Sequence, residues 1–198
     1  IAKILRVAGM SKVTDVYGPI PYSKSMQGGL SVEYDSQEDI YKSFFADLEE
    51  SINALTAFVD ANGDQSTRLT FDKMCGRSHT TWLRYANTLR LRLAMRVVKF
   101  DAVWAQTEAE AAMSDSNGLI ETNDGNLKFS GKGYTNPLTT LVAWGDCSLN
   151  ANMTSILGGM NDARLKLMAN EIDGKVVGFR TGVDIPGGFK DVAFGKVS

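Results

Sequence analysis

Residues 82–96, WLRYANTLRLRLAMR, constrain the fold more than any other part of this chain, because they form one unbroken pattern at helical spacing. A polar residue recurs at every fourth position and predicts one polar stripe, formed by Arg84, Thr88, Arg92 and Arg96. Apolar residues take most of the remaining circumference: Trp82, Leu83, Ala86, Leu89, Leu91, Leu93, Met95, Val97 and Val98. The sequence therefore predicts a mostly buried helix over residues 80–99.

Individual positions in and after this helix give further predictions. Arg90 lies off the polar stripe among apolar neighbours, and a buried guanidinium needs a paired acceptor, so we expect a salt bridge to a carboxylate elsewhere. Leu89 and Leu93 are expected in the core, whereas Thr88, on the polar stripe, is expected to tolerate replacement by Ala. Asp101 can cap a further helix, rich in alanine, over residues 102–113.

The first part of the chain predicts a short helix, a long loop and a second helix. Residues 3–13 carry apolar side chains at helical spacing, and the loop at 17–29 holds Gly and Pro residues that cannot continue a helix. We expect Tyr17 and Tyr22 to anchor this loop. Asp35 and Ser36 offer an N-cap for an amphipathic helix that runs to about residue 58.

The overall composition is that of an ordinary globular domain. The chain has 198 residues, of which 43% are hydrophobic and 22% are charged, which is sufficient for a substantial core. A net charge of -2 lacks the excess of Lys and Arg that nucleic-acid binding requires, so we expect no nucleic-acid partner. We predict one mainly α-helical domain over residues 1–198, in which residues 1–113 form stacked antiparallel helix pairs and residues 114–198 form a loop-rich part.

The loop-rich part shows little sustained periodicity. We expect short helices there, and a hairpin over residues 172–180 around Asp173 and Gly174, a pair favoured where φ must be positive. The sequence has no apolar run long enough for a membrane span, and its first residues lack the pattern of a signal peptide. Because the chain opens within a helical pattern, we expect a portion of a longer protein whose targeting information lies outside it.

The sequence offers little material for catalysis. His79, the only histidine, precedes the helix of residues 80–99 and is interpreted as a residue at the start of that helix or on the surface, rather than as a general base. The motifs of serine hydrolases, zinc peptidases and nucleotide-binding proteins do not occur. A pair of carboxylates for glycoside hydrolysis leaves no mark in one sequence and stays open. We predict that the protein is not an enzyme and uses no cofactor.

Metal binding has equally weak support in the sequence. Cys75 and Cys147 lie far apart without zinc-ligand spacing, and we interpret them as two unrelated buried thiols. Residues 60–72 begin like the calcium loop of an EF-hand. Gln65 and Phe71 stand where that loop needs Gly and Glu, so a polar loop between helices is the better interpretation.

Binding of a polar nutrient is easier to support. Sugars are commonly held by flat aromatic faces with a few amides and carboxylates, and binding residues concentrate on loops. Our candidate ligand-binding residues lie close together in the loop-rich part: Tyr134, Asn136, Trp144 and Asp146. The competing interpretation of Trp144 is packing against the core, the role that we predict for Trp82 and Trp104.

At this point the order of several segments resembles a known family. The segments are TDVYGPIPYS, YDSQEDIYKSFFADLEESINAL, WLRYANTLRLRLAMRV, GMNDARL and GKVVGFRTG. Together they are similar to successive landmarks of SusD/RagB proteins, specifically of the second SusD-like subgroup. The first and third segments are the specific ones, whereas GMNDARL, with DARL in place of the more usual DPRL, and GKVVGFRTG are weak on their own.

This resemblance implies a mostly α-helical fold in which tetratricopeptide-like helix pairs support irregular ligand-binding loops. It also implies a lipid-anchored protein of the outer-membrane surface, seated on a SusC-like TonB-dependent transporter, to which it delivers glycans or, in some relatives, peptides. Family members are normally far longer and carry a lipidated N-terminal Cys, so the membrane anchor is expected outside this chain. The alternative from another class is a helical-repeat scaffold that only bridges proteins.

Overall fold

The structure is a computed structural model that describes residues 1–25, 27–28, 31–64, 66–129, 135–144, 148–169, 171 and 173–183. The chain forms two compact units, unit 1 (residues 1–131) and unit 2 (residues 132–198), and each is described by itself. That both units act as a single domain stays a prediction.

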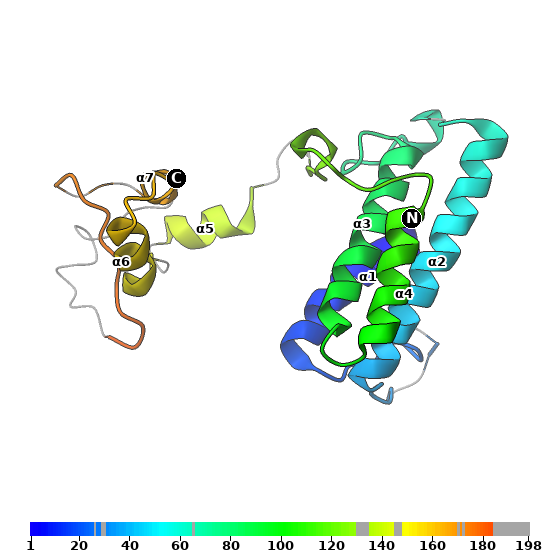
Figure 1. Cartoon of the computed structure of the whole chain (residues 1–198), viewed down its shortest axis with the longest axis horizontal. Coiled ribbons are helices and arrows are strands. Elements are labelled where there is room, and N and C mark those ends of the chain that lie inside the picture. Colours follow the sequence, from blue (N-terminus) through cyan, green and yellow to red (C-terminus); the bar gives the residue numbers. More distant parts are fainter. Residues whose placement is uncertain are drawn as a thin grey trace. The chain divides into compact units, whose positions relative to one another are not determined.

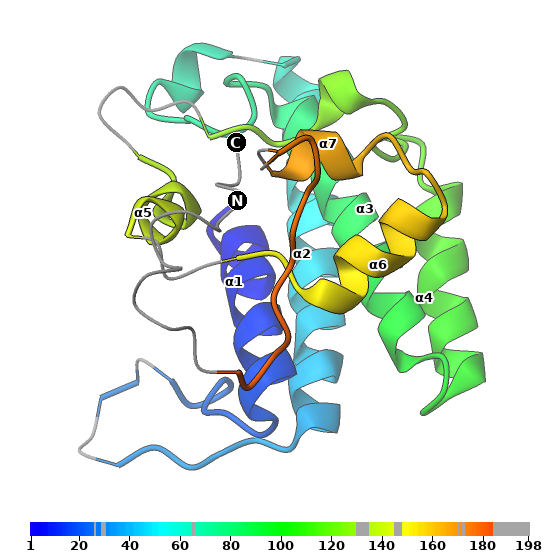
Figure 2. The ribbon, with the colours of Figure 1, turned by 90° about the vertical axis from the view of Figure 1, so that its left-hand side faces the viewer.

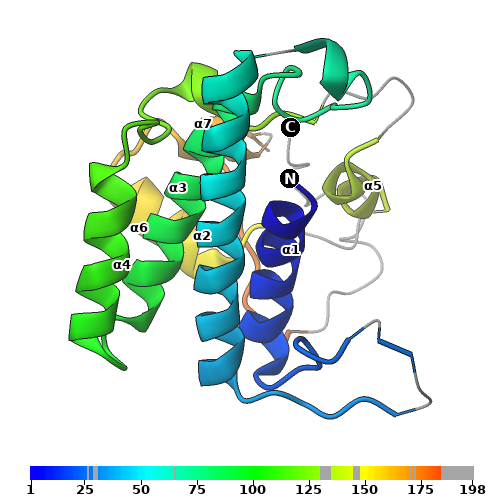
Figure 3. The same ribbon diagram turned by 90° about the vertical axis from the view of Figure 1, so that its right-hand side faces the viewer.

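Unit 1 is a layer of antiparallel helices. Its four long helices are α1 (Ala2–Tyr17), α2 (Gln37–Asn62), α3 (His79–Val97) and α4 (Ala102–Ser114), and its short 3-10 turns are η1 (Ser66–Leu69) and η2 (Asn123–Gly125). Each long helix packs against the next one in the sequence, and successive helices run in opposite directions (Figures 1 and 3). This arrangement confirms the predicted mainly helical fold with antiparallel helix pairs.

Side-chain caps explain where these helices begin. Ser36, Ser78 and Asp101 each accept a hydrogen bond from a backbone N–H of the first turn, and Asp101 Oδ1 accepts two, at 2.9 and 3.0 Å. The predicted caps at Ser36 and Asp101 are confirmed. Both α1 and α2 run about four residues further than predicted, because the helical backbone continues until Gly18 and Gly63, at φ 72° and 71°, close it.

The apolar faces of the four helices form one core, which includes Ile4, Val7, Ile40, Phe44, Leu48, Leu83, Leu89 and Leu93. Arg90 lies at its edge and pairs with Glu108 of α4 at 2.7 Å, so the expected salt bridge is confirmed. The prediction was wrong for Met95 and Val98, which are 64% and 39% exposed. Met95 follows Thr88 by seven residues, nearly two full turns, and therefore lies on the polar side of the helix.

The described residues of unit 2 contain three short helices, α5 (Pro137–Ala143), α6 (Ala151–Gly159) and α7 (Leu165–Met168). Asp173 and Gly174 have φ values of 50° and 76°, which confirms the turn predicted there. Phe179, however, forms a parallel bridge with Asn150, just before α6 (Figure 2). This end of the predicted hairpin therefore pairs with a distant segment. Among the helices of the described residues, none is both long and apolar enough to cross a membrane.

Candidate functional site

Trp144 and Asn136 flank the short helix α5. The Trp144 side chain is 68% exposed, and its backbone N–H donates to the Thr140 carbonyl at 3.1 Å. The Asn136 carbonyl accepts from the N–H groups of Thr139 and Thr140, and its side chain is exposed. The two residues therefore lie at opposite ends of the helix, roughly 12 Å apart along its axis at 1.5 Å per residue. Tyr134 and Asp146, the other two candidates, lie outside the described residues.

The other two tryptophans serve the packing of unit 1, as predicted. Trp82 is 2% exposed, and its indole N–H donates to Asp72 at 3.1 Å. Trp104 is half-buried and packs edge to face against Phe45, with 5.2 Å between ring centroids. Trp144 therefore differs from both, because its indole is exposed to solvent and available to a flat ligand surface.

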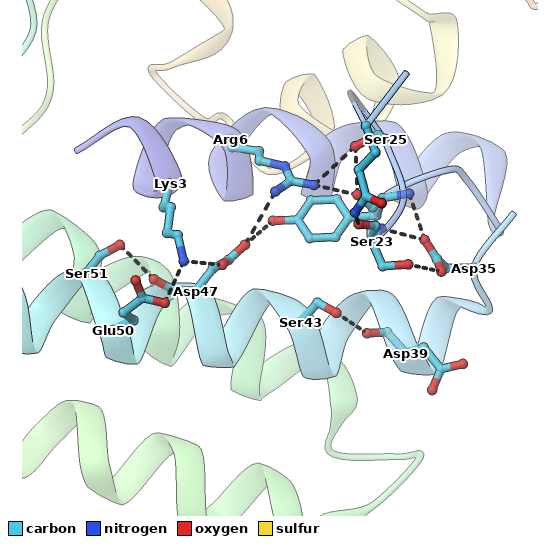
Figure 4. A network of polar contacts seen from close by, with 12 residues as sticks. Lys3, Arg6, Ser23, Ser25, Asp35, Asp39, Ser43, Asp47, Glu50 and Ser51 are labelled. Carbon is cyan, nitrogen blue, oxygen red and sulfur yellow. Dashed lines mark hydrogen bonds and ion pairs between the residues drawn. The ribbon is translucent and has the colours of Figure 1, made fainter. Parts of the chain in front are cut away.

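The loop between α1 and α2 contains the segment TDVYGPIPYS and is fixed by Tyr22. This ring is 1% exposed, and its hydroxyl donates to Asp47 of α2 at 2.7 Å (Figure 4). Burial, together with this hydrogen bond, raises the pKa of Tyr22. The Arg6 guanidinium lies 3.9 Å from the ring centroid, while Lys3 pairs with Asp47 at 3.1 Å. One of the two specific family-like segments is therefore held to α1 and α2 by one polar network.

Asp35 closes the same loop at its other end. Its carboxylate accepts hydrogen bonds from the Ser23 hydroxyl at 2.6 Å and from the backbone N–H groups of Ser23 and Tyr22 at 2.7 and 2.8 Å. These bonds, led by the Ser23 hydroxyl, lower the pKa of Asp35. The prediction that Tyr17 anchors the loop was wrong, since Tyr17 is 74% exposed. The buried row of α1 passes through Ile4, Val7, Ser11 and Thr14 and would next reach residue 18.

His79 holds the start of α3. Its backbone N–H donates to Asp64 at 2.7 Å, its Nδ1 lies 3.3 Å from the same carboxylate, and its ring lies 4.9 Å from that of Phe58. The predicted position at the helix start is confirmed, but the side chain is buried rather than on the surface, at 5% exposure. Nothing within the described residues gathers three or more His, Cys, Asp or Glu side chains around a possible metal position.

Asp72 organises the turn that leads into α3. Its two oxygens accept from the backbone N–H groups of Met74, Cys75 and Arg77 and from the Trp82 indole, at 2.8 to 3.1 Å. Burial works to raise the pKa of Asp72, but these hydrogen bonds outweigh it and the pKa is lowered. Cys75 is buried, as predicted, and burial raises the pKa of its thiol to about 12. Both groups therefore have structural roles.

A cluster that the sequence did not single out joins α1, α2 and α3. Arg96 donates from Nη2 to Asp15 at 2.7 Å and from Nε to the Tyr41 hydroxyl at 3.1 Å, and that hydroxyl donates to Asp15 at 3.1 Å. A pocket of about 580 Å³ opens over this cluster. Sequence spacing placed Arg96 on a polar stripe of its own helix. That spacing could not identify its partners, Asp15 of α1 and Tyr41 of α2.

The comparisons with known proteins agree with this helical arrangement. The model of the SusD-like family, described as "Susd and RagB outer membrane lipoprotein", matches residues 1–194. The chain belongs to the SusD-like family. Among curated proteins, no sequence matches this chain.

Three solved relatives of this SusD-like chain show the extent of the match. A chitin-binding SusD homolog from Flavobacterium johnsoniae has 38% sequence identity and a TM-score of 0.89, over 99% of this chain and 42% of its own. A SusD homolog from Bacteroides vulgatus has 34% identity and a TM-score of 0.86, over 99% and 41%. A third, from Bacteroides uniformis, has 33% identity and a TM-score of 0.85, over 100% and 42%. The chain therefore spans about two fifths of the length of these relatives.

Proposed function

We propose that this SusD-like chain is part of a cell-surface protein that binds glycans and delivers them to a SusC-like TonB-dependent transporter. The observation that carries the proposal is the exposed indole of Trp144, in a chain similar to a chitin-binding homolog over nearly its whole length. An exposed indole offers a flat apolar face to a sugar ring, and Asn136 adds an amide at the opposite end of the short helix α5.

The site that we propose consists of Trp144, Asn136, Tyr134 and Asp146. Trp144 is the stacking surface, while the other three supply hydroxyl, amide and carboxylate groups for the sugar hydroxyls. The role is binding rather than catalysis. We place the protein at the outer-membrane surface, held by a lipid anchor outside this chain, because the matched family is described as an outer-membrane lipoprotein.

Two alternatives lead to different results in a binding experiment. A peptide-binding relative would use the same exposed aromatic surface for a different nutrient. A helical-repeat scaffold would bind neither glycan nor peptide and would use the stacked helices of unit 1 to bridge proteins. We favour glycan binding, because the solved relative at 38% identity binds chitin.

Isothermal titration of the intact protein with chitotetraose, maltotetraose, cellotetraose and a tetrapeptide mixture tests the proposal. We expect binding of one of the three saccharides and a loss of about two- to tenfold in affinity for Trp144→Ala, the range for one aromatic contact. The melting temperature should change little, because an exposed ring contributes little to the core. Ile156→Ala in α6, 60% exposed in the same unit, is the matched control and should bind like wild type.

Two results would count against this function, and a third would count against the Trp144 site. Peptide binding without saccharide binding would favour the peptide relative, and hydrolysis of a polysaccharide would contradict a pure binding role. If Trp144→Ala bound saccharide as tightly as wild type, the glycan-binding function would stand, but Trp144 would not be part of the binding site. The gene neighbourhood gives an independent check, since a SusC-like transporter gene should lie beside the gene for this protein.

A further inference from the structure

The pocket over Asp15, Tyr41 and Arg96 lies at one end of unit 1. It is lined by residues from the end of α1, the start of α2, the end of α3 and the start of α4: Asp15, Gln37, Glu38, Tyr41, Met95, Arg96, Val97, Phe100 and Trp104. Figures 1 and 3 show these four helix ends together at the lower end of the layer. With about 580 Å³, the pocket is within the size range of small-molecule sites.

The charged groups that line this pocket are already paired. Asp15 and Arg96 form an ion pair at 2.7 Å, and Glu38 pairs with Lys42 one turn further along α2 at 2.6 Å. A charged ligand would therefore find no unpaired counter-charge among the described lining residues and would lose its hydration shell on entering. The pocket favours a ligand without net charge.

The same lining groups keep hydrogen-bonding capacity for neutral polar groups. Arg96 uses Nε and Nη2 in its contacts, so Nη1 stays available as a donor. Asp15 uses Oδ1 for both of its contacts, which leaves Oδ2 as an acceptor. Gln37 donates through its amide nitrogen to the Thr14 carbonyl at 3.0 Å, and its amide oxygen remains an acceptor. Donors and acceptors are thus held at fixed positions by three helices.

Aromatic surface completes the pocket. Phe100, in the turn between α3 and α4, is 67% exposed, and the neighbouring Trp104 ring is half-buried against Phe45. Tyr41 presents its hydroxyl edge to the cluster. Aromatic faces beside paired donors and acceptors suit a molecule with apolar C–H faces and a rim of hydroxyl groups.

We propose that this pocket is a second glycan site, in unit 1, which takes a neutral oligosaccharide through Phe100, Trp104, Arg96 and Asp15. The inference rests on the proposed glycan-binding function and adds to it a separate site and a ligand class without uronic or sulfate groups. Because its donors come from long helices, we expect the pocket geometry to change little on binding.

Fluorine NMR on the intact protein labelled with 5-fluorotryptophan tests this site directly. Trp104→Phe and Trp144→Phe assign the two resonances, and chitotetraose, maltotetraose, cellotetraose and trigalacturonate are the probes. We expect at least one neutral saccharide to shift the Trp104 resonance, whereas trigalacturonate leaves it in place. Phe100→Ala should weaken that titration about two- to tenfold, the range for one aromatic contact.

Two further variants separate binding from folding. Arg96→Gln removes the charge and the forked donor and should weaken the Trp104 titration about tenfold or more. Val103→Ala alters a 76% exposed residue beside Trp104 that does not line the pocket, and it should bind like wild type. If Arg96→Gln does not fold, Phe100→Ala still tests the site, because Phe100 is exposed and its replacement should leave the fold intact.

The outcomes distinguish the two proposals. A shift of the Trp144 resonance with a silent Trp104 resonance would overturn the second site and leave the proposed function intact. A larger Trp104 shift with trigalacturonate than with the neutral saccharides would overturn the neutral ligand class. Silence of both resonances, with no heat in calorimetry for any saccharide, would overturn the glycan-binding function itself.

Discussion

Unit 1 and unit 2 are held together by different kinds of contact. Unit 1 buries the apolar faces of four long helices against one another, in a core that runs from Ile4 to Ala105. Among the described residues of unit 2, the buried hydrophobic residues are Leu165 and Ala169, and the contacts that join its segments are mainly backbone bonds such as Ala151 N to the Phe179 carbonyl at 2.7 Å. The two specific family segments, TDVYGPIPYS and WLRYANTLRLRLAMRV, both lie in the unit with the core.

The largest effect that we expect comes from that core. Leu93→Ala should destabilise the protein by about 2 to 5 kcal/mol, because Leu93 is 2% exposed and its removal leaves a cavity. Urea unfolding measures the change. Ile156→Ala in unit 2, exposed in α6, should change the free energy of unfolding by less than about 0.5 kcal/mol. Equal losses in the two variants would break the contrast between the units.

The polar network of the loop between α1 and α2 comes next. Tyr22→Phe removes the hydroxyl that donates to Asp47 and should cost about 1.5 to 3 kcal/mol, the range for a hydrogen bond to a charged group. Tyr34→Phe is the matched control, since Tyr34 is 71% exposed. Thermal melts of both variants give the comparison. A neutral result for Tyr22→Phe would mean that the bond from the Tyr22 hydroxyl to Asp47 adds nothing to stability and that the other contacts hold the loop.

Asp72 gives a pH-dependent prediction. Asp72→Asn should cost about 1 to 3 kcal/mol near pH 7, because the new amide cannot accept from all the donors around the carboxylate. The folded pKa of Asp72 is lowered, so its contribution is complete above the unfolded value, near pH 4, and is lost as the pH falls through the folded value. Wild type and variant should therefore converge in urea unfolding below pH 4.

Asp162 in unit 2 is the matched control for this titration. Its pKa is lowered to about 2 by hydrogen bonds from Arg164, but the Arg164 side chain is 72% exposed, so solvent screens the pair. Asp162→Asn should therefore shift the unfolding midpoint much less than Asp72→Asn at every pH. A pH dependence of equal size in both variants would show that burial around Asp72 adds nothing.

The smallest effect concerns Thr88, where the structure changes the expectation. Its hydroxyl accepts from the Ile120 backbone N–H at 2.9 Å and so ties the segment after α4 to α3. Thr88→Ala should cost about 1 kcal/mol rather than nothing, whereas Thr88→Ser keeps the acceptor and should cost less. Hydrogen exchange at the Ile120 amide gives a local readout. If the Ile120 amide were equally protected in Thr88→Ala, the Thr88 hydroxyl would contribute nothing to this contact, and Thr88 would be a neutral surface residue.

The sequence predicted much of unit 1 because its signals are local. Apolar spacing located α2 and α3. The hydroxyls of Ser36 and Ser78 cap these helices by accepting hydrogen bonds from backbone N–H groups three residues further along the chain. Spacing also identified Arg90 as a residue in need of a partner, although it could not name Glu108. The choice of that partner depends on how α4 packs against α3, which no local pattern contains.

The candidate sites were harder to predict for the same reason. The cluster of Asp15, Tyr41 and Arg96 joins residues up to 81 positions apart, and each of them looks ordinary within its own helix. Phe179 was expected in a hairpin, but its backbone pairs with Asn150 instead. In unit 2 the choice of Trp144 came from its place in a loop-rich segment without sustained periodicity. Its exposure agrees with a binding role, and that role stays a prediction.

The buried thiol of Cys75 has a consequence for measuring the motions of this protein. Burial raises the pKa of the Cys75 thiol to about 12, so little reactive thiolate forms at pH 7, and the residue is 4% exposed. Alkylation of Cys75 should therefore be slow in the folded protein, and opening of the turn held by Asp72 should speed it. In a Cys147→Ser background, the rate of Cys75 labelling therefore reports how often that turn opens. Slower labelling would show that this turn opens less often.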